Sequence, residues 1–365
     1  MAGTSKTSNG RTTGATIGTL SKIDAYGFKR GEDFDYKSYE NFESEYLAVL
    51  ARRMKRWNEK VLDNGQAKSV KHRRMVKRFC RKGIPERHRP MVWMDVSGAR
   101  KKMQKEPEKY QKLLSSDPDT LEDRLVQDAI NTDLDRTFPD NIHFQVATAE
   151  NQKKQLNNIL IAYGRHRPEI GYCQGMNYIT ALLLIVVKDE EKCFWLLSVL
   201  IDTILPQYYS KMMTALRAEL NVLTEIVGTK YPNIQRVMDS EGIPWMLVAS
   251  KWFICLYIDI LPIETVLRIW DCLFYEGSKV LFRVALFLIK DKETVIKECN
   301  GMPDIIESFK NLKTDDRALE CHQFIHDCFI ETNPLPKAEI KKLRTKHVAL
   351  VEEEDRKLAA KREAR

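Results

Sequence analysis

The chain has 365 residues, of which 43% are hydrophobic and 30% are charged, so most of it should be globular rather than disordered. Its net charge of +8 is concentrated in residues 51–90, which hold fifteen Lys or Arg against three acidic residues. This segment predicts either a solvated basic helix face or a surface for nucleic acid, anionic lipid or an acidic protein. Aromatic residues are not interleaved with its cations at regular spacing, which argues against RNA binding.

The eight cysteines form no CxxC pair, and several lie in apolar, helix-like segments. No secretory signal is visible, and the longest apolar candidate for a membrane span, 245–261, contains Lys251 and Asp259. We therefore expect reduced thiols and a cytoplasmic protein.

The N-terminal part of the chain consists of successive segments that differ in composition and in predicted structure. Residues 1–20 are rich in Gly, Ser and Thr and predict a flexible tail, whereas "IDAYGFKRGEDFDYKSYENF" is aromatic and acidic and should pack onto the main body. A helix is predicted over 41–62 because apolar residues and one arginine recur with helical spacing. The residues of that face are Phe42, Tyr46, Val49, Leu50 and Arg53. "NGQAKS" then predicts a linker that completes an N-terminal extension over 21–69.

From residue 70 to 335 the patterns indicate one large helical domain. In "NQKKQLNNILIAYG" the stripe is formed by Leu156, Ile159, Leu160 and Tyr163. Gly164 is expected to end that helix. Prolines separate the later helical segments, and neither alternating strands nor a repeat of fixed period occurs. The sequence thus predicts an all-α domain, followed over 336–365 by a charged helix that projects or frays.

Several kinds of catalytic site find no support in the sequence. No GxxxxGK[ST] or GxGxxG motif occurs, so no nucleotide-binding loop is expected. Cys173 is not followed by the arginine that a phosphatase-type cradle requires, and a packed thiol is favoured. His322 and His326 have the spacing of zinc ligands, but Gln323 stands where a metalloprotease has glutamate. No metal site is predicted.

The stretch "INTDLDRTFP" is the first candidate for chemistry on a nucleotide that a partner carries. Asp133 and Arg136 would be neighbours on a helix whose Ile130 faces inward. Pro139 disfavours the α region at Phe138, so Arg136 should lie near a helix C-terminus and reach outward. Taken alone, this spacing favours an ordinary surface ion pair of little energetic value.

The stretch "EIGYCQGMNY" supplies the second candidate, because Gln174 lies on a glycine-flanked turn before a strongly apolar segment. Glutamine is not a nucleophile, but its amide can accept a hydrogen bond from water and donate another. Hydrolysis of GTP on a small GTPase needs positive charge against the developing phosphate charge and a polar group that orients the attacking water. Arg136 and Gln174 together would provide both.

These stretches resemble the signature motifs of TBC domains. "RKGIPERHRPMVW", "INTDLDRTFP" and "GYCQGMNYI" occur in the order of the family's three motifs, and residues 252–277 resemble its C-terminal half. The resemblance spans residues 78–290. It implies an all-α fold of two subdomains and activity as a Rab GTPase-activating protein in membrane trafficking.

The resemblance also implies roles for single residues. Arg136 matches the family's arginine finger, and Gln174 matches the glutamine that replaces the Rab's own. Asp133 matches the acidic residue that holds the arginine, while Tyr172 and Gly175 match the support around the glutamine. The implied partner is a GTP-bound Rab, which brings GTP and Mg²⁺, so no cofactor of the chain's own is expected. Membrane association would be transient and through the Rab, and no nucleic acid is expected.

A narrower resemblance within the family rests on "IDAYGFKRGEDFDY" and "ECHQF", and it implies that the N-terminal segment belongs to the packed unit. Two alternatives stay open. One is an effector or scaffold that binds Rabs without stimulating hydrolysis, and the other is a basic module centred on 51–90 that binds lipid or nucleic acid. The presence of both fingers favours the GTPase activator, whereas no motif indicates which Rab is its substrate.

Overall fold

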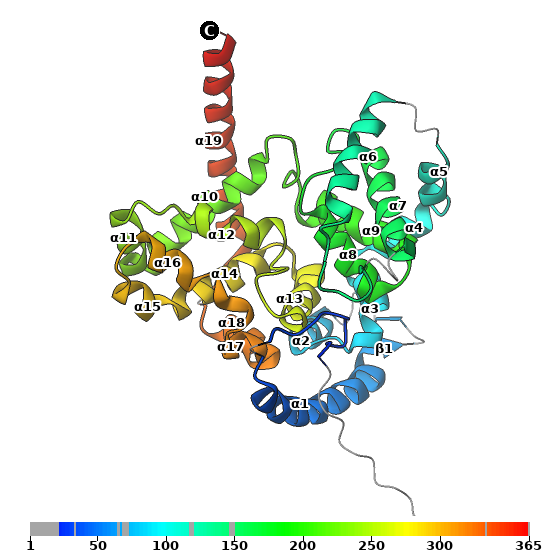
Figure 1. Ribbon diagram of the computed structural model, residues 1–365, viewed down its shortest axis with the longest axis horizontal. Coiled ribbons are helices and arrows are strands. Elements are labelled where there is room, and N and C mark those ends of the chain that lie inside the picture. The colour runs from blue at the N-terminus through cyan, green and yellow to red at the C-terminus, as the bar shows by residue number, and fades with distance from the viewer. Residues whose placement is uncertain are drawn as a thin grey trace, which may run out of the picture.

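The computed structural model describes residues 22–32, 34–63, 66–67, 73–116, 120–145, 150–332 and 334–363. Strands in these ranges are confined to one two-stranded antiparallel hairpin, Leu62–Asp63 (β1) with Gln66–Ala67 (β2), within and beside the predicted linker. Everything else that is regular is helical (Figure 1), which confirms the predicted all-α fold. The predicted tail over 1–20 lies outside the described residues, and the predicted domain boundaries stay predictions.

The helices divide at residue 205 into two sets. The first set of α-helices is α1 (Tyr36–Arg56), α2 (Arg73–Lys82), α3 (Arg89–Ser97), α4 (Ala99–Lys105), α5 (Lys109–Ser115), α6 (Leu121–Leu134), α7 (Glu150–His166), α8 (Met176–Val187) and α9 (Glu190–Val199). The second set is α10 (Thr214–Lys230), α11 (Pro232–Ser240), α12 (Trp245–Ile254), α13 (Ile263–Glu276), α14 (Lys279–Asp291), α15 (Glu293–Glu298), α16 (Met302–Ser308), α17 (Asp316–Leu319), α18 (Cys321–Ile330) and α19 (Lys337–Glu363). Short π and 3₁₀ turns are η1 (Trp57–Val61), η3 (Glu86–His88), η4 (Leu200–Ile204) and η5 (Asn311–Lys313).

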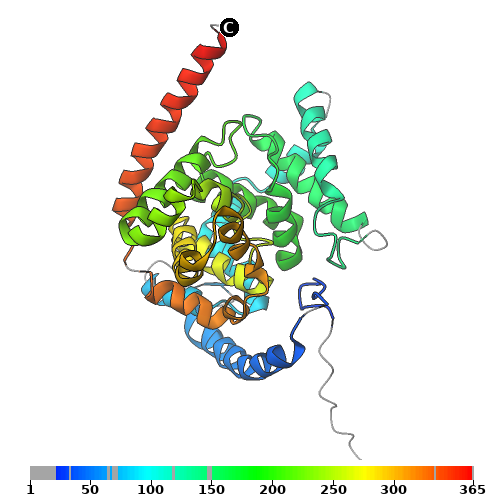
Figure 2. The same ribbon diagram turned by 60° about the vertical axis from the view of Figure 1, so that its left-hand side comes forward.

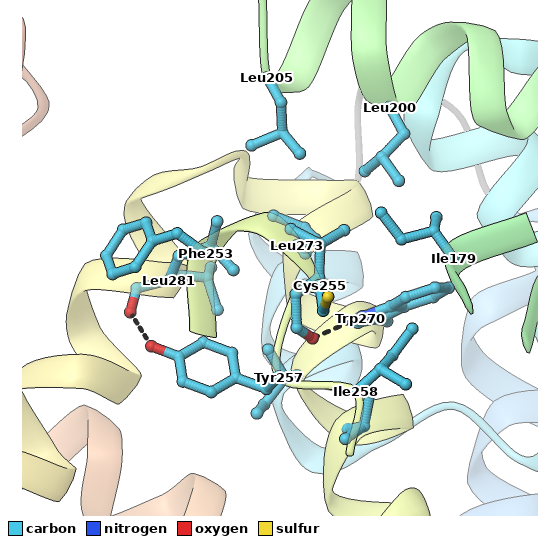
Figure 3. Packing of buried hydrophobic residues seen from close by; sticks show 14 of the residues in the cluster. Ile179, Leu200, Leu205, Phe253, Cys255, Tyr257, Ile258, Trp270, Leu273 and Leu281 are labelled. Atoms are coloured by element: carbon cyan, nitrogen blue, oxygen red, sulfur yellow. Dashed lines mark hydrogen bonds between the residues drawn. The ribbon is translucent and has the colours of Figure 1, made fainter. Parts of the chain in front are cut away.

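In Figure 1, α4–α9 lie on the right and α10–α12, α14–α16 and α19 lie on the left, with α2, α3 and α13 between them and α1 below. Helix α3 contacts α8 and α9 on one side and α13 on the other, so it joins the two halves. Figure 3 shows part of the shared core, in which Ile179 of α8 lies beside Trp270 of α13. Trp270 is fully buried, and its indole N–H donates to the Leu256 carbonyl at 3.2 Å.

Helix α1 starts earlier than its apolar pattern predicts. Asp35 caps it, because one carboxylate oxygen accepts hydrogen bonds of 3.0 Å from the amides of Lys37 and Ser38. The predicted face is confirmed in part, since Tyr46 and Arg53 are 8% and 7% exposed, whereas Phe42, Val49 and Leu50 are half-buried. The arginine therefore belongs to the buried side of the helix.

Helix α7 corrects one expectation. Its predicted stripe is buried, but the helix runs past Gly164 to His166. Gly164 has a packing role instead, since a Cβ there would lie 3.0 Å from Val126 Cγ1 of α6. The glycine thus lets α6 and α7 approach closely, and α6 is the helix that leads to Arg136.

The basic segment 51–90 does not simply form a solvated face, because three of its cations turn inward. Arg53 is buried, and Arg81 donates to the Glu276 carboxylate at 2.8 Å. Arg89 is 1% exposed and pairs with Glu264 on α13 at 2.8 Å. Arg81 and Arg89 compensate carboxylates far along the chain, and Arg53 instead donates to the Tyr46 hydroxyl, so the local excess of charge overstates the basic surface.

The C-terminal helix α19 docks on α10 before it projects (Figures 1 and 2). Arg344 pairs with the buried Glu219 of α10, and Arg217 of α10 donates to Asp355 at 2.6 Å. Only the last turns of α19 extend beyond these contacts. Among the helices in the described ranges, none is both long and apolar enough to cross a membrane.

Candidate catalytic site

The turn that carries Arg136 follows directly from the end of α6. The helix stops at Leu134, and Phe138 has a φ of +49°, which is left-handed, immediately before Pro139. The prediction that Phe138 leaves the right-handed α region is therefore confirmed. The Arg136 side chain is 49% exposed and forms an ion pair with Asp133 on the last turn of the helix.

Asp133 connects this arginine turn to the turn that carries Gln174. Its side chain is only 4% exposed, and its two carboxylate oxygens have different partners. Oδ1 pairs with Arg136, while Oδ2 accepts a hydrogen bond of 2.5 Å from the Tyr172 hydroxyl. Burial and this hydrogen bond raise the pKa of Tyr172, so the phenol stays protonated and remains a donor.

The glutamine turn depends on glycine at both ends. Gly171 has a φ of +62° and Gly175 a φ of +104°, and Gly175 is the residue from which α8 begins. A Cβ at Gly175 would lie 3.6 Å from Ile254, which is ordinary contact, so the requirement there is conformational rather than steric. Gln174 is exposed between these glycines, and its side chain forms no hydrogen bond with another described residue.

A second path connects the two turns, and the sequence did not reveal it. The Thr137 hydroxyl donates to the Asp133 carbonyl at 2.6 Å and accepts from Asn177 Nδ2 at 2.8 Å. Asn177 Oδ1 in turn accepts from the Gly175 amide at 3.1 Å. Thr137 and Asn177 are 1% and 0% exposed, so the hydrogen bonds are shielded from water. Both residues lie inside the two motifs, but nothing about a threonine or an asparagine alone indicates this role.

An aromatic contact adds a third connection. The rings of Phe138 and Tyr178 meet edge to face with centroids 5.4 Å apart. The Tyr178 hydroxyl also donates to the Arg136 carbonyl at 3.3 Å. The backbone of the arginine turn is therefore held against α8, the helix that follows Gln174.

The cysteine and histidine candidates from the sequence give no support to covalent or metal chemistry. Burial, with a smaller contribution from Asp133, raises the pKa of the Cys173 thiol to about 11, so it is not a thiolate at neutral pH. His322 lies 3.4 Å from an Arg53 nitrogen, and His326 lies 3.3 Å from Asp327. Within the described residues, no three His, Cys, Asp or Glu side chains converge as metal ligands.

The arrangement thus presents an exposed guanidinium and an exposed amide on two turns whose supports are buried and mutually bonded. Such donors can stabilise charge and orient water on a ligand brought from outside. Of the five predicted site residues, Asp133 lies on the last turn of α6, Arg136 on the turn that follows it, and Tyr172, Gln174 and Gly175 on the glutamine turn.

The chain belongs to the Rab GTPase-activating TBC family, because the model of the Rab-GTPase-TBC domain matches residues 86–297. Within that family it is similar to growth hormone-regulated TBC protein 1-A of Danio rerio, with 48% identity over 88% of each chain. It is also 46% identical to growth hormone-regulated TBC protein 1 of Homo sapiens, over 88% of this chain and 94% of the human one.

Solved structures agree with this assignment. The TBC domain of a Chlamydomonas flagellar RabGAP matches with a TM-score of 0.69 and 29% identity, over 86% of this chain and all of that one. The Ypt/Rab-GAP domain of Gyp1p matches with a TM-score of 0.64, and at 19% identity it supports the fold alone, over 77% of this chain and 98% of that one.

Proposed function

We propose that this protein accelerates GTP hydrolysis by a Rab GTPase, and that Arg136 and Gln174 act on the nucleotide of the Rab. The observation that carries the proposal is the buried Asp133 carboxylate, which holds Arg136 with one oxygen and Tyr172, two residues before Gln174, with the other. A surface ion pair would not need a buried carboxylate shared between two turns. The family assignment supports the choice of a Rab as partner.

In this mechanism the partner supplies GTP and Mg²⁺, and the chain supplies two groups. The Arg136 guanidinium approaches the transferring phosphate and offsets its developing charge. The Gln174 amide accepts a hydrogen bond from the attacking water and holds it in line, with no proton transfer to the chain. Because both side chains start from fixed turns, little reorganisation is needed when the Rab docks.

The expected contribution of the arginine is large. An arginine finger accelerates hydrolysis by about 10³ to 10⁵, which corresponds to roughly 4–7 kcal/mol of barrier. Lysine should not replace it, because an ammonium lacks the planar pair of donors that can bridge two oxygens. We further propose that the protein meets the GTP-bound Rab on the cytoplasmic face of Rab-bearing membranes.

The test is phosphate release from a panel of GTP-loaded Rabs under single-turnover conditions. Wild type, Arg136→Ala, Arg136→Lys and Gln174→Ala are compared, and Arg356→Ala is the matched control. Arg356 is an exposed arginine on α19 whose recorded ion pair is with Glu353, within its own helix. We expect acceleration on one or a few Rabs that the three site variants lose and the control retains.

Two other results would change the proposed mechanism or replace the proposed function. A mild Gln174→Ala effect would mean that the Rab's own glutamine orients the water. Binding to GTP-loaded Rabs that survives loss of both fingers, with no acceleration by the wild type, would replace the proposal with a scaffold role.

A further inference from the structure

An N-terminal segment, residues 22–32, packs against the arginine turn although it lies outside the family match at 86–297. It folds into a tight turn around Asp24, whose carboxylate accepts from the amides of Tyr26 at 2.8 Å and Phe28 at 2.9 Å. Gly27 has a φ of +89°, and a Cβ there would lie 2.7 Å from the His143 ring. The turn is thus shaped to fit the chain that follows Arg136.

Backbone hydrogen bonds join the segment to that chain. The Ile142 amide donates to the Gly27 carbonyl at 2.9 Å, and the Lys29 amide donates to the Asp140 carbonyl at 3.1 Å. Between them Asn141 is fully buried, and its Nδ2 donates to the Tyr26 carbonyl at 3.0 Å. The loop after Arg136 therefore forms part of its fold with residues more than a hundred positions earlier.

Phe28 extends this contact to Phe138, which lies two residues after Arg136. Its ring meets Phe138 edge to face with centroids 4.9 Å apart. Phe138 is two residues from Arg136, has a left-handed backbone and contacts Tyr178 of α8 on another side. Phe28 and Tyr178 thus both pack on the residue that redirects the chain after the arginine.

The segment is itself anchored in the core. The Tyr26 hydroxyl donates to Glu264 of α13 at 2.6 Å and accepts from the buried Arg89 at 2.6 Å. Arg89 also pairs with Asp271 of α13 at 3.2 Å. The dark-blue chain ahead of α1 in Figure 1 accordingly lies beside α13.

We propose that Phe28 is a positioning residue for Arg136, and that the N-terminal segment is a working part of the catalytic site. The proposal rests on the function proposed above. Arg136 is half-exposed and has one recorded ion pair, so the geometry of its turn decides where the guanidinium lies. A displacement of about 1 Å at such a group can cost about 100-fold in rate.

The experiment uses the full chain and a GTP-loaded Rab that the wild type activates. Phe28→Ala is expected to lower kcat by about tenfold or more, with KM for the Rab within about twofold. Phe28→Tyr keeps the ring and should restore most of kcat. Phe34→Ala is the control, since Phe34 is a partly buried aromatic residue whose recorded ring contacts are with Tyr36, Tyr39 and Arg30. Unchanged kcat in Phe28→Ala would overturn the proposal.

A double-mutant cycle shows whether Phe28 acts through Arg136. In the Arg136→Ala background, Phe28→Ala should cause no further loss of rate. An equal loss in both backgrounds would overturn the positioning role. If Arg136→Ala itself leaves the rate unchanged, the proposed function fails instead, so the two failures are distinct.

Hydrogen exchange gives a readout that does not depend on activity. Phe28→Ala should speed exchange at the amides of Asn141 and Ile142, both hydrogen-bonded in the loop, and leave α9 unchanged. Unchanged exchange there would count against the proposal. If Phe28→Ala melts near the assay temperature, Phe28→Leu decides: it should lower kcat several-fold, and an unchanged kcat would overturn the proposal.

Discussion

Thr137→Val should remove a hydrogen-bonded link between the two turns of the site without mutating Arg136 or Gln174. Valine nearly preserves the shape of threonine but lacks the hydroxyl that bonds both Asp133 and Asn177. The buried Nδ2 of Asn177 would lose the partner recorded for it, which costs about 1–3 kcal/mol, and the Asp133 carbonyl would lose a bond worth about 1 kcal/mol. We therefore expect unfolding free energy to fall by about 2–4 kcal/mol.

The loss of the Thr137 hydrogen bonds should also lower the rate of GTP hydrolysis. Asn177 holds the Gly175 amide, so a released Asn177 side chain no longer fixes the turn of Gln174. We expect single-turnover hydrolysis on the cognate Rab to slow by about tenfold at a temperature where the variant is folded. Urea unfolding and phosphate release measure the two effects separately.

Thr137→Ser is the matched control, because it keeps the hydroxyl and loses only a methyl group. The serine variant should stay within about 1 kcal/mol of the wild type, with a similar rate. If the valine and serine variants have the same stability and the same rate, the bridge between the turns has no energetic importance and the reasoning is refuted.

Two further predictions concern the ion pairs of Glu276 and the glutamine turn. Burial alone would raise the pKa of Glu276, but hydrogen bonds and charge from Arg81 and Lys279 outweigh burial and lower the pKa from 4.5 to about 2. The resulting stabilisation, about 3 kcal/mol, is present above the ordinary pKa and is lost as pH falls toward 2. The unfolding free energies of wild type and Glu276→Gln, measured with urea from pH 7 to 3, should therefore converge as pH falls, and a constant gap would contradict this. Gly175→Ala imposes backbone strain of at least about 1–2 kcal/mol at a φ of +104°, as Gly98→Ala does at +85° between α3 and α4. Thermal unfolding should reveal both losses, but only Gly175→Ala should lower kcat; an equal effect of Gly98→Ala on kcat would count against the role of the turn.

Local patterns predicted much of the fold because they report local physics. The stripe of α7 and the face of α1 follow from helical spacing; the stripe is buried as expected, and Tyr46 and Arg53 of the α1 face are buried too. Gly164 was wrongly expected to end α7, because its role depends on Val126 of a neighbouring helix, which no local pattern reveals. Local sequence patterns therefore did not predict contacts between helices.

Charge in the basic segment was misjudged for the same reason. Arg81 and Arg89 look like ordinary cations in a basic run, yet their carboxylates, Glu276, Glu264 and Asp271, lie in α13. The surface that could attract anionic lipid or nucleic acid is therefore smaller than the sequence indicates. The smaller basic surface weakens the interpretation of 51–90 as an independent binding module, and this argument does not depend on any motif.

At the site itself, the sequence predicted the exposed groups better than what holds them. The pairing of Asp133 with Arg136 follows from spacing on one helix, and the glycines around Gln174 predict its turn. The connection between the turns does not follow, because Thr137 and Asn177 are forty positions apart and individually ordinary. Support of this kind is specified by the packed fold, in which a buried polar group must find a partner.

In the proposed mechanism, Asp133 must hold Arg136 without withdrawing it from the nucleotide of the Rab, and its two oxygens have different partners. A carboxylate can accept both donors of an arginine fork, and such a bidentate pair would draw the guanidinium back onto the helix. Here Tyr172 donates to Oδ2 and the ion pair with Arg136 is made at Oδ1, so the tyrosine competes with a bidentate pair. The tyrosine beside the glutamine turn therefore limits how firmly the arginine is retained. The same hydrogen bond joins the two turns, and in the proposed mechanism it lets the protein present both groups together to the nucleotide of a Rab.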